Sequence, residues 1–456
     1  MQSITINEIV TAIKGKLLTG NKDLPINDIT TSSREIKENS IFIALIGEIH
    51  DGHTFLEDAY NNGCRSFIID DNHTFNKENI NLISVPNTTK ALGDVALYYK
   101  SLFNIPYIAV TGSVGKTSTK DIIYSVLKTK YNVLKNEGNF NNEIGVPKTI
   151  FNLDKNHELA ILELGISKKD EMDYLENIVH PDIAVISNIG MSHIENYKDQ
   201  EELFMEKLKI SKSFNKNNLL LINGDDKLLK TLKNKNQDYK ILSYGFDTSN
   251  DIYCTKYNIV DDSTTFSCLI NNKEEEFFIP SPAKHNILNA MAAILLGIHF
   301  NIDINSIKEG LKKLSLTKMR LEIINTNKYK IIDDTYNASS DSMISALDVL
   351  KSQKGRKVAI LGDIFETGNY EEKIHREVGK NIIGNTNILI TIGTSSKYIS
   401  EEAKNLGFDK DNTYHFYDKE ELYKSLESIL KKEDVILLKA SRGMKLDEVT
   451  SFIKEL

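Results

Sequence analysis

The residues of this chain best placed to do chemistry lie in one short stretch, YIAVTGSVGKTSTK at 107–120. Tyr107 to Val110 form an apolar run typical of a buried strand, and helical periodicity follows Thr117. A strand, a glycine-rich turn and a helix N-terminus allow backbone N–H groups to surround a phosphate. The turn and the start of the helix comprise Gly112, Ser113, Val114, Gly115, Lys116, Thr117 and Ser118.

This stretch predicts a phosphate loop in which Lys116 neutralises the β- and γ-phosphates and the Thr117 hydroxyl ligates Mg²⁺. The alternative is an ordinary strand-to-helix turn capped by a threonine. The chain departs from the general phosphate-loop pattern at one position, because that pattern begins with a glycine where this chain has Val110.

Two more polar residues follow predicted strands further along the chain. Glu163 ends the apolar run ILELG, where its carboxylate could reach a metal ion held by Thr117. His193 comes just after PDIAVISNIG at 181–190. The alternatives are an acid at a helix-start turn and a solvated loop histidine. Because ligands of open α/β sheets bind at the carboxyl ends of strands, we expect both residues near the phosphate loop.

Lys207 stands out on the predicted helix EELFMEKLKISKSF at 201–214. Leu203, Ile210 and Phe214 share one stripe of this helix, and Lys207 lies inside that stripe. Burying a bare ammonium group is costly, so this lysine must snorkel to water, pair with an anion or be chemically altered.

Two amides are spaced to bind a nucleotide. Asn286 and Asn289 lie three residues apart, on one face at the start of a predicted helix, where they could reach an adenine or ribose edge. N-capping by Asn286 is the alternative. The last third of the chain places further polar residues after strands, which suits a negatively charged substrate or a transferring phosphoryl group. These residues are Arg320, Asp334, Asn337, Asp363, Lys439 and Arg442.

Alternating apolar strands and helices predict an α/β protein with parallel sheets covered on both faces. We expect three domains: a small N-terminal α/β domain at 1–84, a central phosphate-loop domain at 85–315, and a Rossmann-like C-terminal domain at 316–456. A hairpin-like stretch at 241–279 interrupts the central pattern.

Composition excludes several classes of function. The net charge of −8 gives no basic footprint for nucleic acid. Three widely separated cysteines argue against a disulfide framework or a zinc site and fit a reducing cytosol. The N-terminus lacks a signal-peptide pattern, and no apolar run reaches the ~20 residues of a membrane span. We therefore expect a cytoplasmic protein.

Taken together, these motifs resemble those of the Mur ligases. The resemblance rests on TGSVGKTS, GNFNNEIGVP, LELG, SHIE, KHNILNA, DDTYNASSDSM, LGDIFETG and KASRGM, in this order. It extends over essentially the whole chain, since the segment at 32–59 is similar to the family's N-terminal uridine-nucleotide domain. The family's phosphate loop has the shorter form, which accounts for Val110.

The resemblance implies an ATP-dependent ligase that joins D-alanyl-D-alanine to UDP-MurNAc-tripeptide through an acyl phosphate. It implies two Mg²⁺ ions, one held by Thr117 and Glu163 and one by Glu163, His193 and Lys207. Lys207 would carry a carbamate, which turns an ammonium into an oxygen ligand. Asn141 matches a position near the reacting groups, and a monomer is expected. Residues matching the uridine-nucleotide end are Ser33, Arg34, Asp51 and His53.

Two departures from the family pattern are modest. Ser32 replaces an acid, and Ser339-Ser340 replaces Asn-Pro. The family member that adds the third peptide residue remains an alternative, although no DNPR-like motif is present. Folylpolyglutamate synthase fits less well because of the N-terminal uridine-type segment. An inactive nucleotide-binding relative should lack one of Lys116, Glu163, His193 or Lys207.

Overall fold

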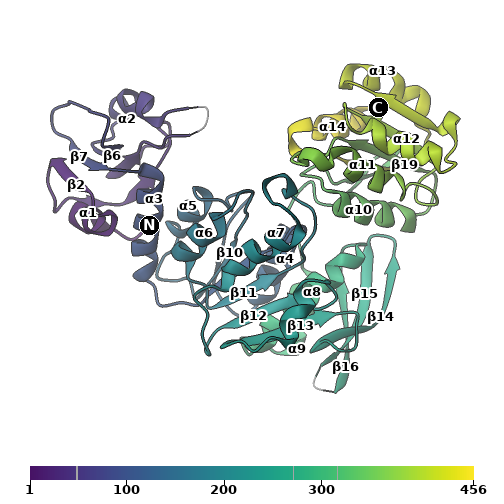
Figure 1. Cartoon of the computed structure of the whole chain (residues 1–456), viewed down its shortest axis with the longest axis horizontal. Coiled ribbons are helices and arrows are strands. Elements are labelled where there is room, and N and C mark those ends of the chain that lie inside the picture. Colours follow the sequence, from purple (N-terminus) through teal and green to yellow (C-terminus); the bar gives the residue numbers. More distant parts are fainter. Residues whose placement is uncertain (48–49, 271, 316) are drawn as a thin grey trace.

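The computed structural model describes residues 1–47, 50–270, 272–315 and 317–456. Three bodies of α/β structure follow one another along the chain, with the N-terminal part at the left of Figure 1 and the C-terminal part at the upper right. Each is built around its own mainly parallel sheet. The predicted fold class is confirmed.

The N-terminal sheet has the strand order β2-β7-β6-β5-β4, and β2 alone in that order runs antiparallel to its neighbour. The first strand and β3 form a separate antiparallel pair. Glu48 and Ile49, in the segment similar to a uridine-nucleotide domain, lie outside the described residues. The elements are β1 (Ile4–Thr5), α1 (Ile6–Ile13), β2 (Lys16–Thr19), β3 (Pro25–Ile26), β4 (Asp28–Thr30), β5 (Ser40–Ile43), α2 (Leu56–Asn61), β6 (Ser66–Asp70), β7 (Asn81–Val85) and α3 (Thr88–Ser101).

The central sheet has the order β16-β15-β14-β13-β12-β11-β8-β10-β9. Strands β8 to β14 pair in parallel, whereas β14, β15 and β16 form the antiparallel arm at the lower right of Figure 1. The elements are β8 (Tyr107–Thr111), α4 (Lys116–Leu127), β9 (Val133–Lys135), α5 (Gly145–Ile150), β10 (Leu159–Glu163), α6 (Glu171–Val179), β11 (Ile183–Ile186), α7 (Gln200–Leu208), β12 (Leu219–Asn223), β13 (Lys240–Gly245), β14 (Ile252–Val260), β15 (Ser263–Ile270), β16 (Lys273–Ile279), α8 (Lys284–His299) and α9 (Ile304–Lys312).

Strands β8, β10, β11 and β12 of this sheet are buried and largely apolar because both of their faces are covered. In β8, Tyr107 and Ala109 point into one buried cluster, while Ile108 and Val110 point into another. The first cluster lies under α3, α5 and α6, and the second under α4, α8 and α9. Alternate residues of a strand face opposite sides, so a doubly covered strand has no polar positions.

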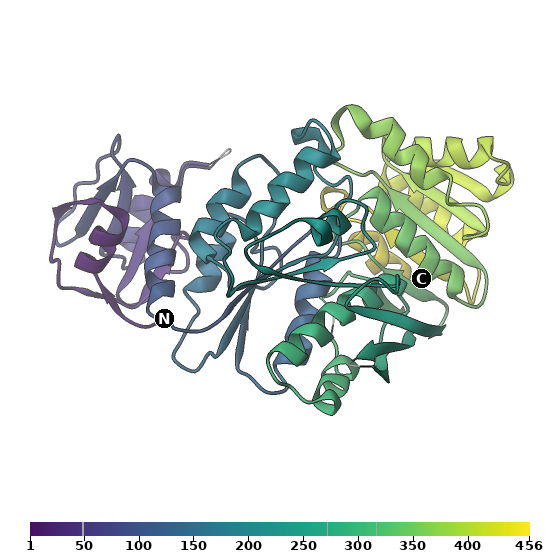
Figure 2. The ribbon, with the colours of Figure 1, turned by 60° about the horizontal axis from the view of Figure 1, so that its bottom comes forward.

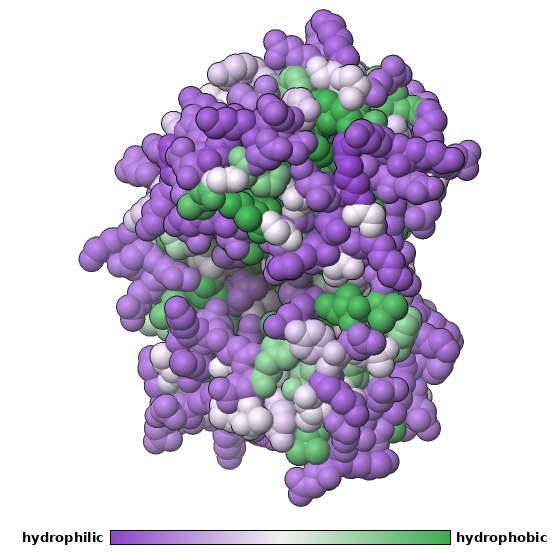
Figure 3. Space-filling model, turned by 90° about the vertical axis from the view of Figure 1, so that its right-hand side faces the viewer, coloured by the Kyte–Doolittle hydropathy of each residue, from purple (hydrophilic) through white to green (hydrophobic). Residues whose placement is uncertain are grey.

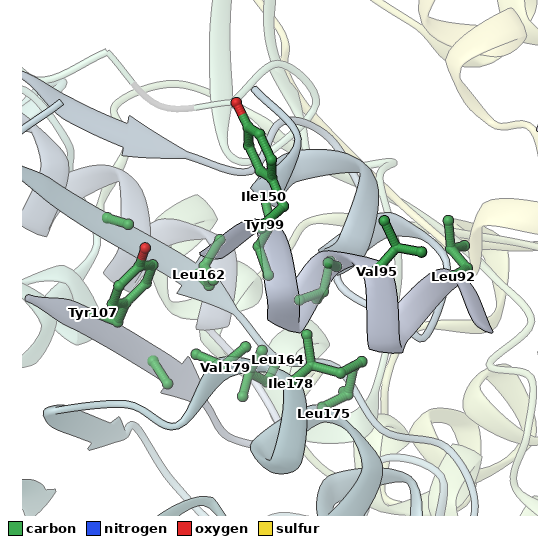
Figure 4. Packing of buried hydrophobic residues seen from close by; sticks show 14 of the residues in the cluster. Leu92, Val95, Tyr99, Tyr107, Ile150, Leu162, Leu164, Leu175, Ile178 and Val179 are labelled. Atoms are coloured by element: carbon green, nitrogen blue, oxygen red, sulfur yellow. The ribbon is translucent and has the colours of Figure 1, made fainter. Parts of the chain in front are cut away.

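Helix α3 joins the N-terminal part to the central part through one continuous core. Leu92, Val95 and Tyr99 of α3 pack beside Leu175 and other residues of α6, as Figure 4 shows. The same apolar cluster includes residues of α1 and β7. The Tyr99 hydroxyl also accepts a hydrogen bond from the backbone N–H of Gln2 at 2.6 Å and donates to the carbonyl of Leu153 at 2.8 Å.

The C-terminal sheet has the order β17-β18-β22-β19-β20-β21 and is parallel except at its β17 edge. Figure 2 shows this part lying against the central part. The elements are β17 (Glu322–Asn325), β18 (Lys330–Asp333), α10 (Ser340–Ser352), β19 (Lys357–Gly362), α11 (Glu371–Gly379), β20 (Ile388–Ile392), α12 (Lys397–Asn405), β21 (Thr413–Phe416), α13 (Lys419–Ile429), β22 (Val435–Lys439) and α14 (Asp447–Glu455).

The turn between β14 and β15 reaches the C-terminal part at a point away from the phosphate loop. Asp262 pairs with Lys330, and the side-chain amide of Gln353 donates to the carbonyl of Asp261 at 3.1 Å. Nearer the loop, the Thr317 hydroxyl donates to Asp121 of α4 at 2.6 Å. No helix in the described part of the chain is long and apolar enough to cross a membrane.

Candidate active site

A cavity of about 1000 Å³ lies at the carboxyl end of the central sheet, between the central and C-terminal parts. It opens beside β8, whose neighbours are β11 and β10. The chain leaves β8 toward β9 on one side and later returns to β11 on the other, which makes this the switch point where ligands of open α/β sheets bind. The face drawn in Figure 3 is hollowed between these two parts, and both hydrophilic and hydrophobic residues border the hollow.

The loop after β8 has the conformation that a phosphate loop requires. Gly115, which precedes α4, has a φ of +82°, in the left-handed region that glycine tolerates. The side chain of Asn188 accepts from the N–H of Val114 at 2.9 Å and braces the loop. Lys116 folds back over it, and its Nζ donates to the Gly112 carbonyl at 3.0 Å. Burial lowers the pKa of Lys116.

An arginine from the C-terminal part covers this loop. A terminal nitrogen of Arg320 donates to the Thr117 hydroxyl at 3.0 Å, and the guanidinium lies 4.2 Å from the ring centre of Tyr336. Its Nε is buried and has no hydrogen-bond partner within the described chain. The arginine therefore has N–H donors beside the position where phosphate oxygens are expected.

Glu163 is fully buried at the end of β10, with 2% of its surface exposed. One carboxylate oxygen accepts from the Asn141 amide at 2.7 Å. The other, Oε2, is buried without a hydrogen bond among the described residues. Its nearest cation is the Nζ of Lys120, 3.9 Å away, which itself donates to the Asn136 carbonyl. A buried carboxylate oxygen with an unfilled coordination position suits a hard divalent cation.

His193 lies in the same cavity, after β11. Its Nδ1 is 2.5 Å from a carboxylate oxygen of Glu366, which comes from the C-terminal part. That oxygen lies off the N–H direction, so the two atoms are in close contact without forming an aligned hydrogen bond. Within the described residues, the other ring nitrogen forms no hydrogen bond.

Lys207 is completely buried on α7, and its Nζ has no hydrogen-bond partner in the part of the chain that the structure describes. Burial holds its pKa well below the usual range, the charge of Lys116 lowers the pKa further, and Glu206 opposes both effects. Lys207 is not among the residues that line the cavity. It does not snorkel to water, which removes one of the readings open from sequence.

The two asparagines predicted for a nucleotide are buried at the start of α8. The Asn289 amide donates to Asn286 at 3.0 Å, and its carbonyl oxygen accepts from the Thr119 hydroxyl at 2.9 Å. Asn286 is not the helix cap, since Ala283 occupies that position. Beside them His285 lines the cavity, and burial lowers its pKa to about 4, so its ring is neutral at pH 7.

Opposite these amides, Lys439 is buried and bonded to the Asp334 carboxylate at 2.5 Å and to the Asn337 carbonyl at 2.9 Å. Asp334 also accepts from the N–H of Leu321. These residues line the cavity together with Arg442. Asp363 does not, because its carboxylate accepts the backbone N–H groups of residues 394, 395 and 396.

The residues predicted for a uridine nucleotide lie in the N-terminal part, outside the lining of this cavity. Nδ1 of His53 is 2.6 Å from the Asp51 carboxylate, and its Nε2 accepts from the N–H of Asp70. The Ser33 carbonyl accepts from the Asn62 amide, and Arg34 is exposed beside it.

Three residues near the site were not predicted from sequence. Lys120 gave a weak signal, one helical turn after Lys116. His285 stands directly before Asn286, and Glu366 lies within the LGDIFETG motif. Their positions depend on packing between segments distant in sequence.

A phosphate loop on a parallel sheet, facing a second α/β domain across a polar cavity, defines a nucleotide-binding α/β protein. The Mur ligase middle domain matches residues 110–297, and the Mur ligase glutamate ligase domain matches residues 319–442. The UDP-N-acetylmuramoyl-tripeptide–D-alanyl-D-alanine ligase of Bacillus subtilis is 38% identical over 99% of this chain and 98% of its own length. The chain belongs to the Mur ligase family.

Solved structures agree with this assignment. A MurF crystal structure from Acinetobacter baumannii matches with a TM-score of 0.92 and 27% identity, over 100% of both chains. MurF from Thermotoga maritima, solved in complex with ADP, matches with a TM-score of 0.83 and 26% identity over 94% of this chain and 97% of that one. The similarity to MurF proteins thus covers all three parts of the fold.

Proposed function

We propose that this chain joins D-alanyl-D-alanine to UDP-MurNAc-tripeptide at the expense of ATP. The γ-phosphoryl group passes to the terminal carboxylate of the tripeptide, which gives an acyl phosphate and ADP. The amine of the dipeptide, once deprotonated, attacks the acyl carbon, and the carbon–oxygen bond to phosphate breaks. An amide and inorganic phosphate result.

The observation that carries this proposal is the unfilled carboxylate oxygen of Glu163 in the same cavity as the phosphate loop and His193. Thr117 and Glu163 would hold Mg²⁺ on the nucleotide, and Glu163, His193 and a modified Lys207 would hold a second ion. The cations would screen repulsion between the phosphates and the acceptor carboxylate. Asn141 holds the Glu163 side chain in place through its 2.7 Å hydrogen bond.

The state of Lys207 supports the carbamate. Carbamate formation needs a neutral amine, whose lone pair attacks the carbon of CO₂ while a proton leaves for solvent. Burial holds the pKa of Lys207 well below its usual range, which increases the fraction of neutral amine. The product is an anionic oxygen ligand, and Nζ is otherwise without a partner in the described structure.

The remaining residues divide into three groups according to the part of the substrates that they would contact. Asn286, Asn289, Arg320, Asp334 and Asn337 would grip the nucleotide. Lys439 and Arg442 would face the acceptor side of the cavity. Residues Ser33, Arg34, Asp51 and His53 would meet the uridine end. Asp363 would act only indirectly, by shaping the loop that its carboxylate holds.

We assign these binding roles to three domains, at 1–84, 85–315 and 316–456. The central domain would supply the phosphate loop, and the C-terminal domain would close over the nucleotide with Arg320. We further propose that the protein acts in the cytoplasm, because its expected substrates are soluble. We also propose that it acts as a monomer.

Phosphate release tests this function. With ATP, Mg²⁺ and D-Ala-D-Ala, we expect release only after addition of a UDP-MurNAc-tripeptide, and comparison of the L-lysine and meso-diaminopimelate forms identifies the preferred third residue. Lys116→Ala should reduce the rate of ATP turnover at least about 100-fold, because the cation that stabilises the phosphates is lost. Release with neither tripeptide, or wild-type rates in Lys116→Ala, would contradict the proposal.

A further inference from the structure

The cavity contains one contact that the proposed chemistry has not used: Glu366 of the C-terminal part against His193 of the central part, at 2.5 Å. We infer that Glu366 is a positioning residue, which orients His193 for metal binding and thereby links the metal site to the contact between the two parts. This inference rests on the proposed function, in which His193 is a metal ligand.

The backbone at both residues is held in an uncommon conformation. His193 and Glu366 each have a φ of +60°, in the left-handed region that non-glycine residues seldom occupy. Such conformations persist only where the surroundings impose them, and they concentrate at functional sites. Here the two strained residues face each other across the junction.

Close packing surrounds the contact. Two residues beyond Glu366, a Cβ added to Gly368 would come within 2.8 Å of the Cβ of Glu195. Ile194 and Tyr197, which follow His193, belong to one buried cluster with Ile364 of the C-terminal part and its neighbours. The chain segments on both sides of the contact are therefore packed together, while the Glu366 side chain itself is half exposed at the edge of this junction.

The chemistry of a histidine ligand explains the carboxylate. A divalent cation binds an imidazole nitrogen through its lone pair, so the proton must reside on the other nitrogen. Metal-bound histidines commonly donate that second N–H to a carboxylate. When the proton is on Nδ1, the nitrogen next to Glu366, the lone pair resides on Nε2, which forms no hydrogen bond among the described residues. A small rotation of either side chain would align the contact.

One further charge faces Glu366. The Lys116 ammonium contributes to lowering the pKa of this carboxyl, after the larger effect of His193. Because Glu366 comes from the C-terminal part, separation of the two parts would remove it from His193. By linkage, metal binding at His193 must then favour the joined arrangement to the same extent.

Mn²⁺ binding to the full chain, without nucleotide or substrate, tests the inference. Titrations followed by electron paramagnetic resonance would compare wild type with Glu366→Gln, Glu366→Asp and His193→Ala. We expect Glu366→Gln to weaken Mn²⁺ binding about 10- to 100-fold, in line with other outer-shell partners of metal ligands. Glu366→Asp should restore part of the affinity. The matched control is Glu372→Gln, which breaks an exposed pair with Arg376 on α11.

Spin-echo modulation from an imidazole nitrogen gives a second readout. We expect this signal with wild type and its reduction in Glu366→Gln, and we expect Glu366→Gln to add no loss of affinity in a His193→Ala background. If His193→Ala weakens Mn²⁺ binding and Glu366→Gln does not, the positioning role alone is overturned. The same follows if Glu366→Gln weakens Mn²⁺ binding equally in the wild-type and the His193→Ala backgrounds. Unchanged Mn²⁺ affinity in His193→Ala would instead overturn the proposed metal role of His193.

Discussion

A lysine that is completely buried and has no hydrogen-bond partner within the described residues lowers the stability of the folded chain. Lys207 packs on the same helix as Leu203 and Phe204, which are also buried. Leaving a buried donor unsatisfied costs about 1–3 kcal/mol. A lysine retained at such a position is best explained by a chemical use for the neutral amine, which carbamate formation supplies.

Replacement of this lysine tests that explanation. We expect Lys207→Ala to abolish ligation, because the oxygen ligand for the second cation is lost. Bicarbonate or short carboxylic acids should restore part of the activity by placing a free carboxylate in the vacated space. The measurement is phosphate release with and without added acid. Lys212→Ala is the control, since the side chain of Lys212 is exposed and pairs with Asp173. Full activity in Lys207→Ala would refute the carbamate.

At the level of single elements, the turn before α4 depends on one backbone conformation. Gly115 has a φ of +82°, and a Cβ there would meet nothing closer than 3.8 Å, at Asn289. Space is thus available for a methyl group, and strain is the main cost. A left-handed non-glycine residue loses about 1–2 kcal/mol.

Gly115→Ala can be compared with a glycine in the same conformation elsewhere. Gly63 has a φ of +99° and open space around its Cβ position. We expect both alanine variants to lose about 1–2 kcal/mol of stability in urea unfolding. Only Gly115→Ala should also weaken ATP binding, because the strain relaxes by moving phosphate-loop N–H groups. Equal ATP affinity in the two variants would show that this turn does not bind phosphate.

The amino-acid sequence predicted strands best where both faces of the strand are buried. The strand at 107–111 and those ending at Glu163 and Ile186 are apolar runs bounded by polar residues, and the structure confirms them. Strand β2 was not predicted, because Lys16–Thr19 is mostly exposed and has no alternating pattern. Its strand conformation comes from pairing with β7.

The same limit applies to the site. Strand ends placed Glu163, His193, Asp334 and Lys439 around one cavity. Asp363 also directly follows a strand, but its carboxylate accepts hydrogen bonds from backbone N–H groups of a neighbouring loop. The sequence does not show which loop will lie beside it. Glu366 was missed because its partner lies in another part of the fold.

At the scale of the whole molecule, the C-terminal part meets the central part at separated points. One lies beside the phosphate loop, where Arg320 contacts Thr117. Another is the turn of the β14–β15 arm, where Asp262 pairs with Lys330. An attachment away from the cavity can act as a pivot while contacts at the cavity open and close.

Asp262→Asn should alter the pivot with little effect on stability. The two side chains are partly exposed, and an ion pair near the surface contributes about 0–1 kcal/mol, so the unfolding free energy should change by no more than that. We expect a broader distribution of distances between fluorescent labels on the two parts, and a lower rate of ligation. Glu57→Gln, which breaks the pair with Lys77 inside the N-terminal part, is the control. An unchanged distance distribution in Asp262→Asn would exclude the pivot.

The continuous core under α3 has a consequence for substrate length. Apolar residues of α1, β7, α3 and α6 belong to one cluster, so the N-terminal part cannot swing independently without exposing that core to water. The span between the proposed uridine-binding end and the phosphate loop is then constant. A fixed span would select substrates by the length of their peptide. A precursor whose peptide is one residue too short or too long would place its terminal carboxylate away from the γ-phosphate, regardless of the identity of its side chains.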